Sequence, residues 1–188
     1  MSSKFQKVLF LGMAVLMIFM PIARGTVKVW SMAPFLLISY LLIFIWLWRV
    51  NNDKSGSSSS RLRSFSPAGS TSVFIILFGI LAILSFVFSI YKHDSFFALL
   101  RLLAYIGIFY LLIENFEGHM FRRLLGLVIL IGTVLSLYGI LQYLDFFRHS
   151  WWIPQEFLAA SYVNHNHFAG YLELVIPLTL GMLFSRSS

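Results

Sequence analysis

The chain has 188 residues, of which 59% are hydrophobic and 18% aromatic, whereas only 11% are charged. A soluble domain carries about a quarter charged residues, and the apolar runs here approach the roughly 20 residues that cross a bilayer core, so a membrane protein is expected. The absence of cysteine excludes disulfides and thiolate sites. The basic residues behind the net charge of +7 do not form a basic stripe with stacking aromatics, so no nucleic-acid partner is expected.

Apolar segments predict six transmembrane helices, at about 8–23, 29–48, 73–91, 95–113, 124–144 and 167–184. The first follows Lys4 and Lys7, as a signal peptide would, but no small-residue cleavage site follows it, so we interpret it as a retained helix. The runs lack the period-two alternation of membrane strands. The predicted fold class is therefore all-α, a polytopic transmembrane helix bundle of about six spans.

Three regions are predicted along the chain. Residues 1–48 form an N-terminal transmembrane hairpin, residues 49–72 a flexible cytoplasmic loop, and residues 73–188 a segment with the remaining four spans. The loop is rich in serine and glycine, which bury too little apolar surface to offset the entropy of ordering. A phosphorylated regulatory segment, or contact of its arginines with anionic lipid, remains an alternative.

The distribution of basic residues orients the predicted helices. With the N-terminus inside, the cytoplasmic segments hold nine of the 14 basic residues, namely Lys4, Lys7, Arg49, Lys54, Arg61, Arg63, Arg122, Arg123 and Arg186. The outer segments hold four, namely Arg24, Lys28, Lys92 and Arg148. Because Lys and Arg accumulate on cytoplasmic loops, both termini are predicted to be cytoplasmic.

Polar residues gather where the last predicted helix begins, in the stretch "SYVNHNHFAGYLELVIP" at 161–177. If that helix begins near Asn166, the Asn166 side chain caps its free N–H groups. Asn166, Gly170, Glu173, Pro177 and Gly181 then share one stripe, on which small residues permit close helix approach. Glu173 lies within lipid depth, at a cost of about 3 kcal/mol, and is expected to find a partner in the bundle or to serve a function.

Two further kinds of residue are candidates for binding. His165 and His167 point in different directions on a helix, and the chain has neither cysteine nor a HExxH spacing, so no metal site is predicted. We expect these histidines to bind a polar head group or simply to lie at the membrane interface. Arg101, in "SFFALLRLLAYIGIFYLL", either snorkels to the outer surface or holds a phosphate from that side. We predict that Arg101, Asn164, Asn166 and Glu173 face one polar pocket.

The stretch "NHNHFAGYLELVIPLTLGML", from Asn164 to Leu183, resembles the helix entry of bacterial O-antigen ligases and polymerases, which are multi-spanning membrane glycosyltransferases. The segment "ALLRLLAY", from Ala98 to Tyr105, is similar to a preceding helix of that family. The residues that match the entry pattern are Asn164, Asn166, Gly170, Tyr171 and Pro177. His165 and His167 depart from its usual "NPN" form.

The resemblance implies transfer of a glycan from an undecaprenyl-diphosphate donor to a lipid or glycan acceptor, on the periplasmic side of the bacterial inner membrane, without metal or other cofactor. It implies a role in lipopolysaccharide or another cell-envelope polysaccharide. Residues 73–188 then correspond to the start of the ligase-type domain. The family's catalytic loop has no counterpart in this chain, which therefore looks like an N-terminal portion, and no catalytic residue is carried over.

The residues expected to bind substrate are Arg101, Asn164, His165, Asn166, His167 and Glu173. Two other readings stay open. In a transporter-like protein, Glu173 and Arg101 would line a path for solute. A noncatalytic scaffold or a truncated remnant of the same superfamily would need neither residue for chemistry.

Overall fold

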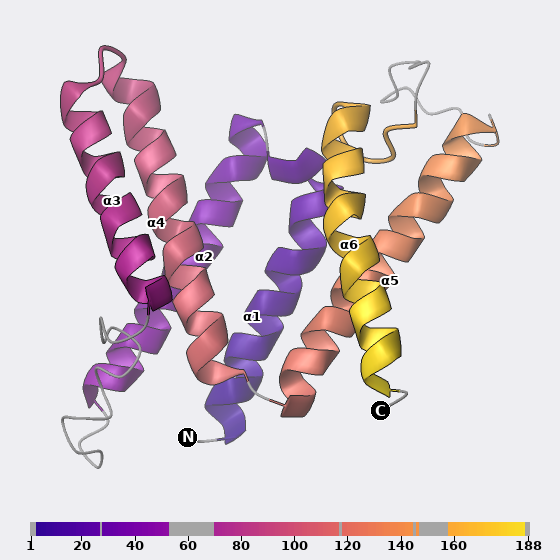
Figure 1. Ribbon diagram of the computed structural model, residues 1–188, viewed down its shortest axis with the longest axis horizontal. Helices are drawn as coiled ribbons and strands as arrows, with labels where there is room; N and C mark the ends of the chain where they lie inside the picture. The colour runs from indigo at the N-terminus through magenta and orange to yellow at the C-terminus, as the bar shows by residue number, and fades with distance from the viewer. Residues whose placement is uncertain are drawn as a thin grey trace. The chain divides into compact units, whose positions relative to one another are not determined.

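The computed structural model describes residues 3–26, 28–52, 70–116, 118–144, 146 and 158–186. Across these residues it contains the helices α1 (Ser3–Ile22), α2 (Val29–Asn52), α3 (Ser70–Phe88), α4 (Lys92–Asn115), α5 (Gly118–Tyr143) and α6 (His165–Arg186) (Figure 1). One short 3-10 helix, η1 (Arg24–Thr26), follows α1. The predicted all-α helix bundle is confirmed, with six α-helices among these residues.

Most of the helices have the length and composition of membrane spans. Five of those described are long and apolar enough to cross a bilayer, namely α1, α2, α4, α5 and α6, whereas the apolar part of α3, Ser72–Phe88, is shorter. Large apolar side chains such as Phe74, Leu81 and Phe88 are exposed, as expected where the solvent is lipid rather than water. The chain is a multi-span helical membrane protein.

Several helices extend beyond the apolar segments that predict them. α2 continues to Asn52, and α4 begins at Lys92, before its predicted start at residue 95, whereas α3 ends at Phe88, before its predicted end at residue 91. Backbone hydrogen bonds continue through the interface, where polar side chains are already hydrated, so hydropathy underestimates helix length. Residues 53–69, which make up most of the predicted cytoplasmic loop, lie outside the described residues.

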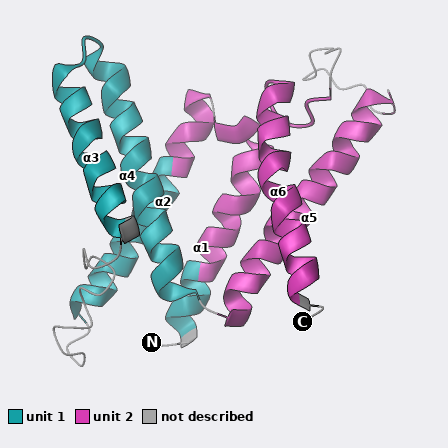
Figure 2. Ribbon diagram, viewed as in Figure 1, with its two compact units in different colours: residues 1–9, 36–117 teal, residues 10–35, 118–188 magenta. Residues whose placement is uncertain are grey.

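The chain divides into two compact units (Figure 2): a first unit of residues 1–9 and 36–117, and a second unit of residues 10–35 and 118–188. In the first unit α3 packs against α4. The hydroxyl of Tyr40, on α2, donates a 2.9 Å hydrogen bond to the backbone oxygen of Leu100, on α4. Gly107 permits a close approach on the same pair of helices, because a Cβ atom there would meet the Ile43 side chain.

In the second unit α5 packs against α6 at glycines. A Cβ atom on Gly132 would lie 2.7 Å from Cγ1 of Val175, and one on Gly139 would lie 2.6 Å from Cδ2 of Leu158. Around these contacts lies a core of buried side chains, namely Ile131, Leu135, Ala160 and Phe168. Small residues therefore let the α5 backbone approach both α6 and the segment that precedes it.

Candidate functional site: a pocket beside the start of α6

The start of α6 is capped by Asn164. Its Oδ1 accepts a 3.0 Å hydrogen bond from the backbone N–H of Asn166, and its carbonyl oxygen accepts from the N–H groups of His167 and Phe168. The sequence pattern favoured Asn166 as the cap, and this is corrected: the helix begins at His165, so the cap lies two residues earlier. Asn166 is the second residue of the helix and its side chain is exposed.

The segment before α6 is attached to the end of α1. The Ser161 hydroxyl donates a 2.7 Å hydrogen bond to the carbonyl oxygen of Pro21, 140 residues earlier. The last carbonyl groups of a helix have no partner within the helix, so this bond satisfies one of them. Ala159 and Ala160 are buried beside it, with Ala160 at a φ of 50°. This attachment places α6 next to α1.

A left-handed turn follows α1. Arg24, Gly25 and Thr26 have φ angles of 58°, 69° and 57°. For residues other than glycine this conformation costs about 1–2 kcal/mol each. Thr26 is buried, and its hydroxyl donates a 2.7 Å hydrogen bond to the carbonyl oxygen of Gly25. Burial of Thr26 thus holds the turn in a conformation that leaves Gly25 on the wall of the pocket described next.

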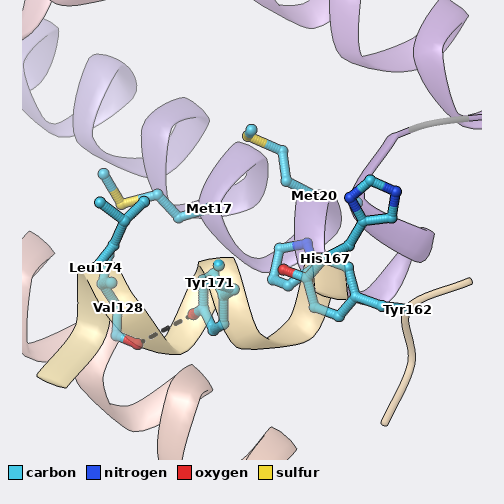
Figure 3. A pocket seen from close by; sticks show the side chains of 10 residues that line it. Met17, Met20, Val128, Tyr162, His167, Tyr171 and Leu174 are labelled. Atoms are coloured by element: carbon cyan, nitrogen blue, oxygen red, sulfur yellow. Dashed lines mark hydrogen bonds between the residues drawn. The ribbon is translucent and has the colours of Figure 1, made fainter. Parts of the chain in front are cut away.

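Between these elements lies a pocket of about 320 Å³ (Figure 3). All its lining residues belong to the second unit; they are Met17, Met20, Pro21, Gly25, Val128, Tyr162, His167, Gly170, Tyr171 and Leu174. The end of α1, η1, α5, the segment before α6 and the first turns of α6 all contribute. The pocket is therefore built by parts of the chain that are distant in sequence.

The pocket is polar at one end and apolar at the other. His167 and Tyr162 lie together at the end near the start of α6, while Met17, Leu174 and Val128 lie at the opposite end, with Tyr171 between (Figure 3). Leu174 follows His167 by seven residues, which is about 10 Å along a helix. The apolar end of the pocket therefore lies further along the α6 span than the polar end. This arrangement matches a ligand that has a polar head and an apolar tail.

Tyrosine side chains give the pocket fixed hydrogen-bonding groups. The Tyr171 hydroxyl donates to the carbonyl oxygen of Val128, on α5, at 3.3 Å. The Tyr162 ring lies 5.8 Å from the Tyr171 ring and 5.9 Å from the Phe168 ring, measured between centroids. Burial, together with the neighbouring Tyr171, raises the pKa of Tyr162 well above that of a free tyrosine. Tyr162 is consequently a neutral hydroxyl at physiological pH.

The predicted site residues have different surroundings. His167 lines the pocket, as do Gly170 and Tyr171 of the resembling stretch. Asn164 is occupied as the helix cap, and His165 is half-buried. Asn166 and Glu173 are exposed and do not line this pocket. The two histidines thus diverge, and no group of three metal-ligating His, Cys, Asp or Glu residues occurs within the described residues.

Arg101 belongs to the first unit and has its own local partner. Its Nε donates a 3.3 Å hydrogen bond to the carbonyl oxygen of Phe97, one turn earlier on α4, and the side chain is half-buried. The other predicted site residues belong to the second unit. A polar pocket shared by Arg101, Asn164, Asn166 and Glu173 therefore stays a prediction.

Sequence reasoning missed several residues of the pocket. Tyr162 was recoverable, because Tyr162, Phe168 and Tyr171 are aromatic residues crowded into one polar stretch. Met17, Met20 and Val128 gave no signal, because apolar residues in membrane helices do not distinguish a pocket wall from a lipid-facing surface. In comparisons of the chain with protein-family models, with curated proteins and with solved structures, nothing matched.

Proposed function

We propose that this chain is the N-terminal membrane portion of an O-antigen ligase-like or polymerase-like protein. The protein would transfer glycan from an undecaprenyl-diphosphate donor to a lipid or glycan acceptor at the periplasmic face of a bacterial inner membrane. The multi-span helical architecture supports a membrane-embedded substrate. The resemblance of residues 164–183 to the helix entry of that family supports the substrate class.

One observation carries the proposal: the pocket lies where the resembling stretch begins, and its polarity changes along α6. Gly170 and Tyr171 match the family pattern and line the pocket, beside His167. A polyprenyl diphosphate has a polar diphosphate joined to a hydrocarbon chain. The His167 end suits the diphosphate, and the Met17 and Leu174 end suits the first isoprene units.

The polar end offers donors to phosphate oxygens. The imidazole of His167 and the neutral hydroxyl of Tyr162 would donate hydrogen bonds to a phosphate there, and the positive end of the α6 dipole lies at the same level. Methionine side chains adapt their shape to irregular hydrocarbon, which suits Met17, beside Leu174, to a branched chain (Figure 3). These residues would hold and orient the donor, whereas the groups that transfer the glycan are not assigned to this chain.

Binding of a lipid-linked glycan to the purified chain in nanodiscs tests the proposal. A Cβ atom at Gly170 meets nothing within 4 Å, so Gly170→Phe places a large side chain at the wall of the pocket from a position with free space around its Cβ atom. We expect it to weaken binding of a polyprenyl-diphosphate disaccharide at least tenfold. Gly126→Phe is the matched control, because that position also has free space but does not line the pocket.

The same experiment separates the proposal from the other two readings. A transporter-like protein would bind a free sugar as tightly as the lipid-linked one, since the isoprenoid would add nothing. A noncatalytic scaffold would bind neither. Equal binding of the donor by the Gly170→Phe and Gly126→Phe variants would contradict the proposal.

A further inference from the structure

We infer that the side of α6 that carries Glu173 is a docking surface for a transmembrane helix that presents an arginine or lysine at the level of this carboxylate. This surface, here called the Glu173 face, consists of Asn166, Glu173, Pro177, Leu180 and Gly181. The inference concerns an interaction surface and does not depend on the proposed donor binding.

The Glu173 face points away from the contact between α6 and α5. Val175 and Phe168 are 6% and 3% exposed, and they face α5 and its core. At about 100° per residue, Glu173 lies about 160° around the helix from Val175. Glu173, Pro177 and Gly181 are all exposed, so nothing within the described residues of the second unit covers this side of α6.

The position of Glu173 makes an uncovered carboxylate costly. α6 is one of the membrane-length helices, and Glu173 lies about 12 Å from its first residue at 1.5 Å per residue. Within the part of the chain that the structure describes, no hydrogen bond or ion pair reaches its carboxylate. Carboxylates within a bilayer almost always face a bundle interior or a wet cavity and pair with another group, so a partner is required.

The chemistry of that partner follows from the backbone. Pro177, inside α6, has no N–H, so the carbonyl oxygen of Glu173 lacks its usual donor four residues later. Residue 173 therefore offers a carboxylate and a carbonyl oxygen without its usual donor, and both are acceptors. An arginine or lysine supplies both a positive charge and several donors. A second α6 would bring another carboxylate and is the wrong occupant.

The shape of the face fits a helix rather than a lipid chain alone. A Cβ atom added to Gly181 would meet nothing within 4 Å. Glycine at this position lets a second helix backbone approach closely, which strengthens interhelical hydrogen bonds and packing. Thus Gly181 provides the close approach, and Glu173 provides the charge that selects the partner.

Site-specific photocrosslinking in the native membrane tests the inference. A benzophenone amino acid replaces Leu180, which is 48% exposed and lies on the Glu173 face, or Leu183, which is 61% exposed and lies roughly 60° further around the helix from that face. We expect Leu180 to give a protein–protein product whose partner peptide is an apolar segment containing Arg or Lys. Leu183 should give mainly lipid adducts.

Charge reversal then connects the product to Glu173. Glu173→Lys should lower the yield at Leu180 about 3- to 30-fold, the range of interhelical hydrogen bonds in membranes, and Glu173→Gln should lower it less. Changing the partner's basic residue to Glu should restore the yield with Glu173→Lys. The glutamine variant keeps the test usable if the lysine variant does not fold.

Several outcomes would overturn the inference. They are a partner peptide without a basic residue, a product between the α6 helices of two copies, lipid adducts only at Leu180, or a yield that neither Glu173 variant changes.

Discussion

Ser161 donates a hydrogen bond to the carbonyl oxygen of Pro21 across 140 residues of sequence, at 2.7 Å. This bond joins the segment before α6 to the last turn of α1, and the pocket lies beside it, with Pro21 in its lining. One hydroxyl thus contributes to the position of both walls of the candidate site. The stability of this part of the molecule should depend on it.

We expect Ser161→Ala to lower the free energy of unfolding by about 0.5–2 kcal/mol, because a partly buried carbonyl oxygen loses its donor. The shift is measured by thermal unfolding in detergent. Ser136→Ala is the control, because the Ser136 hydroxyl bonds only to the carbonyl oxygen of Gly132 in its own helix. Equal shifts for the two variants would show that the Ser161 bond does not stabilise the attachment.

The approach of α5 to α6 predicts opposite effects at two glycines. Gly132→Ala should destabilise by about 1–3 kcal/mol, because the new methyl group would lie 2.7 Å from the stiff side chain of Val175. Gly126→Ala meets nothing within 4 Å and should be neutral or stabilising by up to about 1 kcal/mol.

Unfolding of both variants in the same detergent gives the comparison. Adding Val175→Ala to Gly132→Ala should recover part of the loss, since it removes the atoms that clash. Destabilisation of equal size at both glycines would point to helix propensity or insertion rather than packing.

The cap of α6 distinguishes two asparagines that the sequence pattern treats alike. Asn164→Ala should cost about 0.5–2 kcal/mol, because the N–H of Asn166 loses its side-chain acceptor. Asn166→Ala should cost almost nothing, since the Asn166 side chain is exposed. Hydrogen exchange of the first turn of α6 is the direct measurement. Faster exchange in the Asn166→Ala variant alone would show that Asn166, and not Asn164, caps the helix.

The orientation of the helices stays a prediction from the basic residues. A single cysteine at Asp94, which is exposed in the first turn of α4, should react with an impermeant thiol reagent once the outer membrane is opened. A cysteine at Ser58, outside the described residues, should react only after lysis, because the basic loop is expected inside. The chain has no cysteine of its own, so labelling is unambiguous. Reaction at Ser58 before lysis would reverse the topology.

The helices were predictable because a bilayer leaves few ways to satisfy backbone polar groups. Runs of apolar residues located all six helices, but the ends were missed where polar residues continue the helix, as at Lys92 and Asn52. The cap was missed by two residues because either Asn164 or Asn166 satisfies the same local pattern.

Only some of the residues that line the pocket could be predicted from the sequence. His167, Gly170 and Tyr171 lie in a stretch whose polar residues stand out against an apolar background. Met17 and Val128 do not, because in lipid the buried and exposed sides of a helix have similar composition and no amphipathic pattern reveals which helices meet. The contact between α1 and the segment before α6 rests on Ser161 and Pro21, whose pairing no local rule predicts.

Photolabelling with a lipid-linked donor tests the central claim most directly. A polyprenyl-diphosphate disaccharide with a photoreactive group on its first isoprene unit is bound to the protein in nanodiscs, irradiated and mapped by mass spectrometry. The account predicts labelling of Met17, Met20 or Leu174, reduced at least tenfold by Gly170→Phe and unchanged by Gly126→Phe. Labelling confined to lipid-facing residues such as Phe74 and Leu81, or equal labelling of these peptides in both variants, would contradict it.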